Sequence, residues 1–385
     1  MRSLAALVLT TLLLAGCASP ASHAGRTSTP NPSQHPSPSA APSASSKTPV
    51  TLVVVEEDSA GQTPMLRFFT ESGAESGHLN LSAGAHVLAA GAHRIFIVAA
   101  DGSFKAMHPD GSADTLDSAI TQGFGQSVVT AREDKHWTWA TNTPSTNPVD
   151  TTIKVAGEGS APRVVLTQAI TKGPLEPFAW TPSGIYVNPL PMDAIGYFPF
   201  QPPVITGLMK LVNPVTGAST PVPMGDCAFS DASDAGVIAC FQYGAKPSLR
   251  LIYSPGNVLD LTLATPRFNY MGDAYFSRDG TMLTVAGATG VGMPAELSGG
   301  VQPKPEVYGV DLVRVQDGSI RRFGPTGTRV AMGEESWLPD GKLVLWRPSG
   351  AAGGAAGLYV LDPAGSGQGR LIPTTGRPIG FLAGT

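Results

Sequence analysis

Three acidic residues occur in the same short sequence context in this 385-residue chain. The segments read Met224-Gly-Asp226, Met271-Gly-Asp273 and Met332-Gly-Glu334, and an aromatic residue follows each acid three positions later. Carboxylate oxygens bind hard cations such as Ca²⁺, and they also attract basic peptides or amines. The same carboxylates can instead accept hydrogen bonds from the backbone of their own loops. The pattern leaves both roles open. We assign no metal ligand and no cofactor, with Ca²⁺ at the three acids as the alternative.

The sequence carries none of the common catalytic motifs. It has no Gly-x-Ser-x-Gly segment, no His-Glu-x-x-His segment and no phosphate-binding loop. All seven histidines lie at or before position 136, so the acidic segments have no nearby histidine in sequence to serve as a general base. The segment Glu133-Asp134-Lys135-His136 combines acids with a histidine, but we expect it to be a solvated turn on the opposite face. We assign no catalytic residue.

An apolar, aromatic segment occupies residues 188–206, where a polar loop would be expected. Exposed apolar patches often mark interaction sites, and large aromatic side chains are their usual anchors. Tyr197, Phe198 and Phe200 are therefore the candidate contacts for a partner. The alternative is that the loop folds down and packs against the rest of the domain.

The first 48 residues predict an export signal and a linker. Leu4–Gly16 is an apolar run after Arg2, too short for the roughly 20 residues of a membrane span but right for a signal peptide. It ends Leu14-Ala15-Gly16-Cys17, which resembles the bacterial lipoprotein lipobox. The resemblance implies a signal peptide over 1–17 and acylation of Cys17, hence a lipid anchor on the extracytoplasmic face of the cell membrane. The alternative is an ordinary secretory signal. Residues 18–48 are rich in Ala, Ser, Pro and Thr, which predicts a disordered linker.

Composition limits the partners of the folded part, residues 49–385. Net charge is −4 and only 14% of residues are charged, which argues against nucleic acid as a partner. We expect a monomer. The two cysteines besides Cys17 are Cys227 and Cys240, and they flank a predicted hairpin turn. In an exported protein we expect a disulfide between them; two buried free thiols are the alternative.

Repeated hairpin signals predict an all-β fold. Four turns follow an aromatic residue, as in Trp180-Thr-Pro-Ser-Gly184, and seven strand–turn–strand pairs turn on Gly, Asn or Asp. The spacing favours a β-propeller of seven four-stranded sheets, with six as the alternative. Val50–Val55 and Pro378–Ala383 are strands without a partner in sequence, and pairing them would remove the free sheet edges and close the ring.

Two of the aromatic turns resemble a known family. Phe276-Ser-Arg-Asp-Gly280 and Trp337-Leu-Pro-Asp-Gly341 are similar to the aromatic-Ser-Pro-Asp-Gly hairpin of TolB-type, WD-like bacterial propellers. That resemblance implies a binding or scaffolding head, although a fold alone does not transfer function. We therefore predict a non-enzymatic module that binds a protein, a peptide or a cell-wall ligand. The alternatives are a metal-dependent propeller hydrolase or lactonase that uses the three acids at the channel rim, and a purely structural head.

Overall fold

The computed structural model divides the chain into two units, 1–45 and 46–385. All residues that the structure describes lie in the second unit. They are 49–57, 63–91, 93–118, 128–142, 149–170, 173–189, 207–242, 248–262, 270–289, 307–330, 332–351 and 353–383. Cys17 and the aromatic residues Tyr197, Phe198 and Phe200 lie outside these ranges.

The described residues form 27 strands and one short 3-10 helix, η2 (Gly333–Ser336), which confirms the predicted all-β class. Among them no helix is long and apolar enough to cross a membrane. One sheet has eight strands in the order β3-β2-β1-β27-β4-β5-β6-β7. In chain order its strands are β1 (Val50–Glu57), β2 (Pro64–Thr70), β3 (Glu75–Asn80), β4 (His86–Gly91), β5 (Arg94–Val98), β6 (Phe104–Met107), β7 (Ala113–Asp117) and β27 (Arg377–Ala383).

Four further sheets have four strands each, in the orders β11-β10-β9-β8, β12-β13-β14-β15, β16-β17-β18-β19 and β20-β21-β22-β23. The first two contain β8 (Val128–Thr130), β9 (His136–Asn142), β10 (Val149–Gly157), β11 (Ser160–Ile170), β12 (Leu175–Thr181), β13 (Gly184–Pro189), β14 (Lys210–Val212) and β15 (Ser219–Pro221). The next two contain β16 (Ala228–Ala232), β17 (Ile238–Gln242), β18 (Ser248–Ser254), β19 (Asn257–Leu261), β20 (Tyr270–Phe276), β21 (Met282–Thr289), β22 (Val307–Arg314) and β23 (Ile320–Phe323). The last sheet has β24 (Leu343–Arg347), β25 (Gly357–Leu361) and β26 (Arg370–Pro373).

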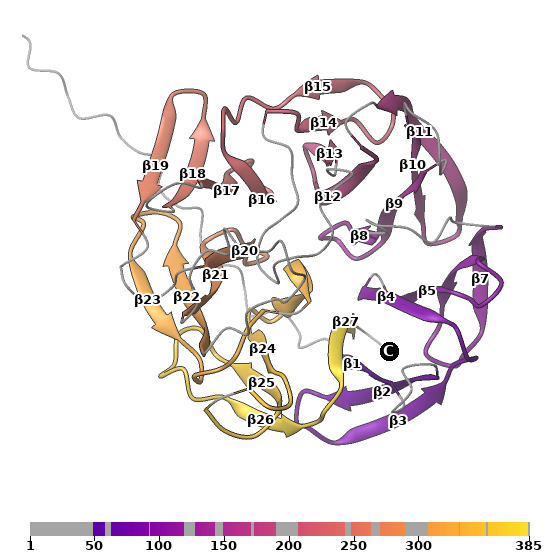
Figure 1. Ribbon diagram of the computed structural model, residues 1–385, viewed down its shortest axis with the longest axis vertical. Coiled ribbons are helices and arrows are strands. Elements are labelled where there is room, and N and C mark those ends of the chain that lie inside the picture. The colour runs from indigo at the N-terminus through magenta and orange to yellow at the C-terminus, as the bar shows by residue number, and fades with distance from the viewer. Residues whose placement is uncertain are drawn as a thin grey trace, which may run out of the picture. The chain divides into compact units, whose positions relative to one another are not determined.

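Within the second unit these sheets follow one another in chain order around a common centre (Figure 1). The seven strand–turn–strand pairs expected from the sequence are all antiparallel pairs in the structure. They are β2–β3, β6–β7, β10–β11, β14–β15, β18–β19, β22–β23 and β25–β26. Turn signals in the sequence therefore locate these hairpins correctly.

The C-terminal strand lies next to the first strand of the domain. β1 and β27 are antiparallel, with Val50 opposite Ala383 and Leu52 opposite Phe381. β27 also meets β4 through one parallel bridge, Gly380 to Ala90. Gly380 has a φ of +141°, and a Cβ at that position would overlap the carbonyl oxygen of Ala90. Only glycine allows this close approach of two backbones.

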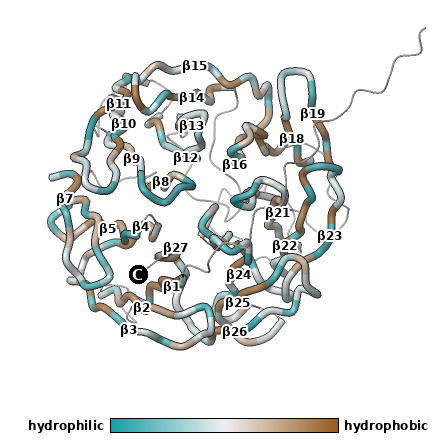
Figure 2. The backbone as a smooth tube through the Cα atoms, turned by 180° about the vertical axis from the view of Figure 1, so that it is seen from behind, coloured by the Kyte–Doolittle hydropathy of each residue, from teal (hydrophilic) through white to brown (hydrophobic). Residues whose placement is uncertain are grey.

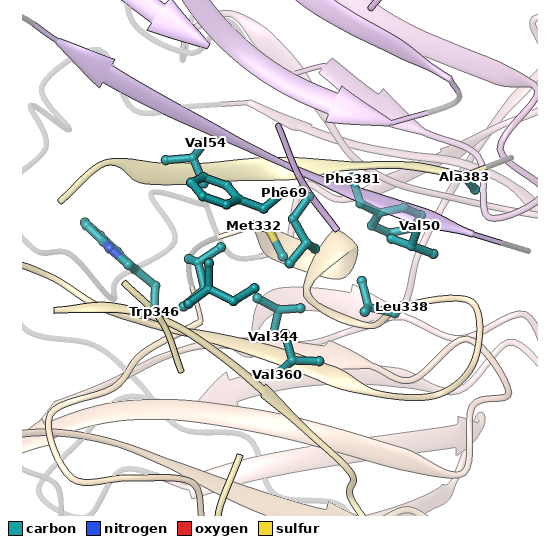
Figure 3. Close-up of a cluster of buried hydrophobic side chains, with 13 residues drawn as sticks. Val50, Val54, Phe69, Met332, Leu338, Val344, Trp346, Val360, Phe381 and Ala383 are labelled. Carbon is teal, nitrogen blue, oxygen red and sulfur yellow. The ribbon is translucent and has the colours of Figure 1, made fainter. Parts of the chain in front are cut away.

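Apolar side chains fill the space between neighbouring sheets. In one cluster, side chains of β1 and β27 face those of β24 and β25 (Figure 3). Leu52 and Leu358 in this cluster have no exposed surface, and complete burial of a leucine side chain is worth about 1.5–3 kcal/mol. Around the centre the chain is more hydrophilic. Figure 2 shows hydrophilic segments in teal beside β8 and β16.

The β16–β17 hairpin carries the predicted disulfide. Cys227 and Cys240 are bonded, with their Cα atoms 5.6 Å apart, and both residues are fully buried. The bond closes a loop over a sequence separation of 13. The prediction of a disulfide is confirmed.

Candidate functional site

Of the three acids expected to form a binding cluster, the structure describes the side chain of Asp226, so the predicted cluster stays a prediction. Asp226 lies in an exposed turn before β16, while the backbone of Asp273 belongs to β20 and that of Glu334 to η2. The side chains of Asp273 and Glu334 are outside the described part of the structure. Among the residues that are described, no group of three or more His, Cys, Asp or Glu side chains is arranged to hold a metal ion.

A different site is present between sheet β8–β11 and sheet β12–β15. A cavity of about 560 Å³ opens there. Turns from both sheets build it, all at the same edge: β8–β9 and β10–β11 from one sheet, β12–β13 and β14–β15 from the other. The lining residues are Glu133, His136, Val155, Ala156, Ser160, Ala161, Arg163, Trp180, Thr181, Pro182, Pro214 and Val215. The cavity therefore lies at the opposite end of β13 from Asn188 and Pro189.

Glu133 and His136 form a hydrogen-bonded pair in the wall of this cavity. Glu133 Oε1 is 2.5 Å from His136 Nδ1, and both side chains are about half exposed (50% and 52%). An ionised carboxylate only accepts hydrogen bonds, so with Glu133 ionised Nδ1 is the donor, and in the neutral imidazole Nε2 is then a proton acceptor. We expected a solvated turn here, and the segment is an exposed turn between β8 and β9. In addition, the hydrogen bond across the turn gives the two side chains a defined geometry beside the cavity.

The strand next to His136 is shaped to receive its imidazole ring. His136 stands opposite Gly157 on β10, and Gly157 stands opposite Ser160 on β11. A Cβ on Gly157 would lie 2.5 Å from His136 Cδ2 and 3.0 Å from Nε2. Because Gly157 has no side chain, the His136 ring can pack directly against β10.

Ser160 is hydrogen-bonded within its own turn. Its Oγ accepts from the backbone N of Gly157 at 2.9 Å and donates to the carbonyl oxygen of Gly157 at 3.1 Å. The hydroxyl proton is directed to that carbonyl, so Ser160 supports the turn and is not the partner of His136 Nε2. On the opposite wall the Trp180 ring lies with its centroid 5.8 Å from that of His136.

A network of charged residues at the centre holds the β8–β9 turn from behind. Arg278, at the tip of the β20–β21 turn, donates to both carboxylate oxygens of Asp134 at 2.7 and 2.9 Å. It also donates to the carbonyl oxygen of Arg132 at 2.9 Å. Asp134 has a φ of +59°, in the left-handed region that costs energy for a residue other than glycine. The bidentate hydrogen bonding from Arg278 to the Asp134 carboxylate stabilises this conformation.

Arg132, two residues before Asp134, connects the same turn to sheet β16–β19. The Arg132 guanidinium lies 3.1 Å from Asp231 Oδ2 and also donates to the carbonyl oxygens of Ala232 and Ser277. Asp231 is buried and accepts further hydrogen bonds from the backbone N atoms of Ala232 and Phe276, each at 2.7 Å. Three sheets thus meet at one turn through charged side chains.

Glu335 completes the network from η2. Thr130 donates to its Oε1, and its Oε2 lies 3.5 Å from Arg278. The residue is 7% exposed, and burial raises the pKa of its carboxyl to about 7 despite the nearby guanidinium. The nearby Asp134 carboxylate contributes to this rise. The sequence did carry a signal for this network, since Arg278 stands where the family pattern has proline.

Comparisons with solved structures place the fold among propeller-like enzymes. The acylaminoacyl peptidase of Pyrococcus horikoshii matches with a TM-score of 0.56 at 12% identity, over 86% of this chain and 51% of the peptidase. Acylaminoacyl peptidase in complex with Z-Gly-Gly-Phe-chloromethyl ketone matches with a TM-score of 0.55 at 13% identity, again over 86% and 51%. The periplasmic gluconolactonase of Pseudomonas aeruginosa matches with a TM-score of 0.44 at 14% identity, over 88% and 100%. No protein-family model and no curated protein matches the chain.

These neighbours contradict our prediction of a non-enzymatic head, because the acylaminoacyl peptidases that match its fold are enzymes. The chain spans about half the length of the peptidase it matches, 51%. At such identities the likeness shows the fold. What the chain itself catalyses must be argued from its own residues.

Proposed function

We propose that this protein is a hydrolase that cleaves ester or lactone bonds in the cavity between sheets β8–β11 and β12–β15. The observation that carries the proposal is the Glu133–His136 pair, joined at 2.5 Å in the wall of that cavity. A carboxylate on Nδ1 fixes the tautomer and orientation of an imidazole, which is the arrangement that general bases need. The shared fold with enzymes adds support.

The reaction follows from the two nitrogen atoms of His136. Nε2 takes a proton from water, and the hydroxide formed attacks the ester carbonyl. The imidazolium then returns the proton to the leaving alcohol, so the products are an acid and an alcohol. Glu133 stabilises the imidazolium while it exists, and positioned acid–base groups of this kind contribute about 10²–10⁴ in rate. The proposal uses the hydrolase or lactonase alternative, but at this pair rather than at Asp226, Asp273 and Glu334.

We also propose that the sheets are the blades of a closed, seven-bladed propeller. The eight-stranded sheet then contains two blades, with β27 as the innermost strand of the first. Isolated bridges from Arg329 to Trp346 and from Trp337 to Leu343 lie at the edge of the three-stranded sheet, which supports a fourth chain segment there. The pairing of β1 with β27 supports closure.

The location of the enzyme belongs to the same proposal. The lipobox-like segment that ends at Cys17 supports a lipid anchor. The disulfide between Cys227 and Cys240 supports an oxidising compartment, where such bonds persist. We therefore propose a lipoprotein on the extracytoplasmic face of the membrane, with residues 18–48 as the linker to the domain 49–385.

Variants of the pair test the proposal. The full chain would be assayed against aryl esters and lactones, together with His136→Gln and Glu133→Gln. We expect kcat to fall by about 10²-fold in each variant. The matched control is His108→Gln, because His108 Nε2 also lies near a carboxylate, 3.7 Å from Asp114, but outside the cavity. Unchanged hydrolysis in folded His136→Gln, or no hydrolysis of any ester by the wild type, would refute the proposal.

A further inference from the structure

The cavity also contains a cation, Arg163, on a different strand of the sheet from His136. Val155 on β10 pairs with Arg163 on β11, and the register shifts between Val155 and Gly157, which pairs with Ser160. Arg163 and His136 both line the cavity between this sheet and sheet β12–β15. Two strand spacings, about 10 Å, separate their strands.

Arg163 has donors that no described acid occupies. Its guanidinium donates to the carbonyl oxygen of Pro214, and no ion pair joins it to any carboxylate in the described part of the chain. A guanidinium carries five N–H donors in a planar fork that matches a carboxylate. By contrast, Arg67, Arg250 and Arg278 each face a carboxylate within 3.1 Å.

The charges at the two ends of the cavity have opposite signs. Glu133 beside His136 repels an anionic group at that end, whereas Arg163 attracts one at the other. Val155, Trp180 and Pro214 add apolar surface to the lining of the same cavity. An ester with an apolar middle and a terminal carboxylate therefore fits in one orientation only, with its carbonyl beside His136.

An exposed apolar side chain continues this apolar lining at the rim of the cavity. Val215 lines the cavity and is 77% exposed. This end of the cavity thus combines a free cation with apolar surface, as the carboxylate-bearing end of an acyl chain requires.

We infer that Arg163 is a specificity-determining residue, and that the enzyme prefers esters whose acyl chain ends in a carboxylate. The inference rests on the proposed hydrolase function of the Glu133–His136 pair. The distal carboxylate binds Arg163 at a position remote from the reacting carbonyl. This contact therefore stabilises the bound substrate and the transition state equally. It lowers KM and leaves kcat unchanged.

The probes are aryl monoesters of dicarboxylic acids, from succinate to suberate, each beside a neutral aryl ester of the same chain length. The full-length wild type should show a lower KM for the charged esters, best at an intermediate chain length. Arg163→Gln should raise KM for the charged esters about tenfold and leave the neutral esters unchanged. Arg163→Lys should retain part of the preference, and Arg370→Gln serves as a control at an exposed arginine outside the cavity. Added salt should weaken the preference.

The outcomes separate the two proposals. If the wild type hydrolyses charged and neutral esters with equal KM, or if Arg163→Gln changes both alike, the inference about Arg163 is wrong while the hydrolase proposal stands. If the wild type hydrolyses neither set, the hydrolase proposal itself has failed. A fall in kcat with KM unchanged in Arg163→Gln would also overturn the inference, because it would place Arg163 at the reacting carbonyl.

Discussion

Replacing Glu335 with glutamine should make the protein markedly less sensitive to pH between about 5 and 8. Glu335 is buried beside Arg278 and Asp134, and its pKa in the folded state is about 7, against an ordinary value of 4.5. A raised folded pKa means that the folded state holds the proton more tightly than the unfolded chain does. The stability this proton provides is therefore complete below about pH 4.5 and is lost as pH rises through about 7.

The size of the effect follows from the two pKa values. They differ by 2.5 (7 − 4.5), and each unit corresponds to about 1.36 kcal/mol, so the whole contribution is about 3 kcal/mol. Most of it, about 2–3 kcal/mol, is lost between pH 5 and pH 8. Glutamine has nearly the shape of the protonated acid, and its oxygen can still accept the hydrogen bond from Thr130, but it does not titrate.

Urea denaturation at pH 5, 6, 7 and 8 measures this contribution directly. The difference in unfolding free energy, Glu335→Gln minus wild type, should rise by about 2–3 kcal/mol across the series. All other titrating groups are common to both proteins, so they largely cancel in the difference. Glu158→Gln, at an exposed glutamate, is the control for the substitution itself. A flat or falling difference for Glu335→Gln would show that the carboxyl is ionised throughout and would refute the reasoning.

Two further changes test other parts of the structure. Gly157→Ala should reduce kcat/KM about 10²-fold, because the new Cβ would lie 2.5 Å from His136 Cδ2 and displace the ring; activity that is unaffected would show that His136 does not need this position. Replacing Cys227 and Cys240 together by serine should lower the unfolding free energy by about 3 kcal/mol, because the bond no longer restricts the unfolded chain. Denaturant titration of both forms measures that loss, and equal midpoints would contradict it.

The fold could be predicted from sequence because its signals are local. Glycine at the end of each turn and the alternation of apolar and polar residues locate a hairpin without reference to the rest of the chain. In Phe276-Ser-Arg-Asp-Gly280, for example, Ser277 Oγ donates to Asp279 at 2.6 Å and Gly280 has a φ of +69°, as the turn signal requires. The disulfide was equally predictable from the sequence, because the two cysteines flank one such turn.

The candidate site could not be predicted in the same way. Whether Glu133 and His136 are merely solvated depends on Trp180 of the neighbouring sheet and on the absence of a side chain at Gly157. Neither contact is visible in the segment itself. The acids that looked most like a site, such as Asp226, were chosen because their sequence context repeats, and repetition reports the architecture rather than the chemistry.

The turn between β8 and β9 connects the cavity with the central network. Arg132 and Asp134 are bound to sheet β16–β19 and to the β20–β21 turn, while Glu133, between them, pairs with His136 in the cavity. Successive residues of one short turn therefore contact the cavity and the central network, and we expect a shift of the turn to affect both. A buried charged network is rarely a net source of stability, since desolvation offsets much of the attraction. Its role here is better explained by position: it fixes the turn, and the turn fixes the orientation of the carboxylate that His136 needs.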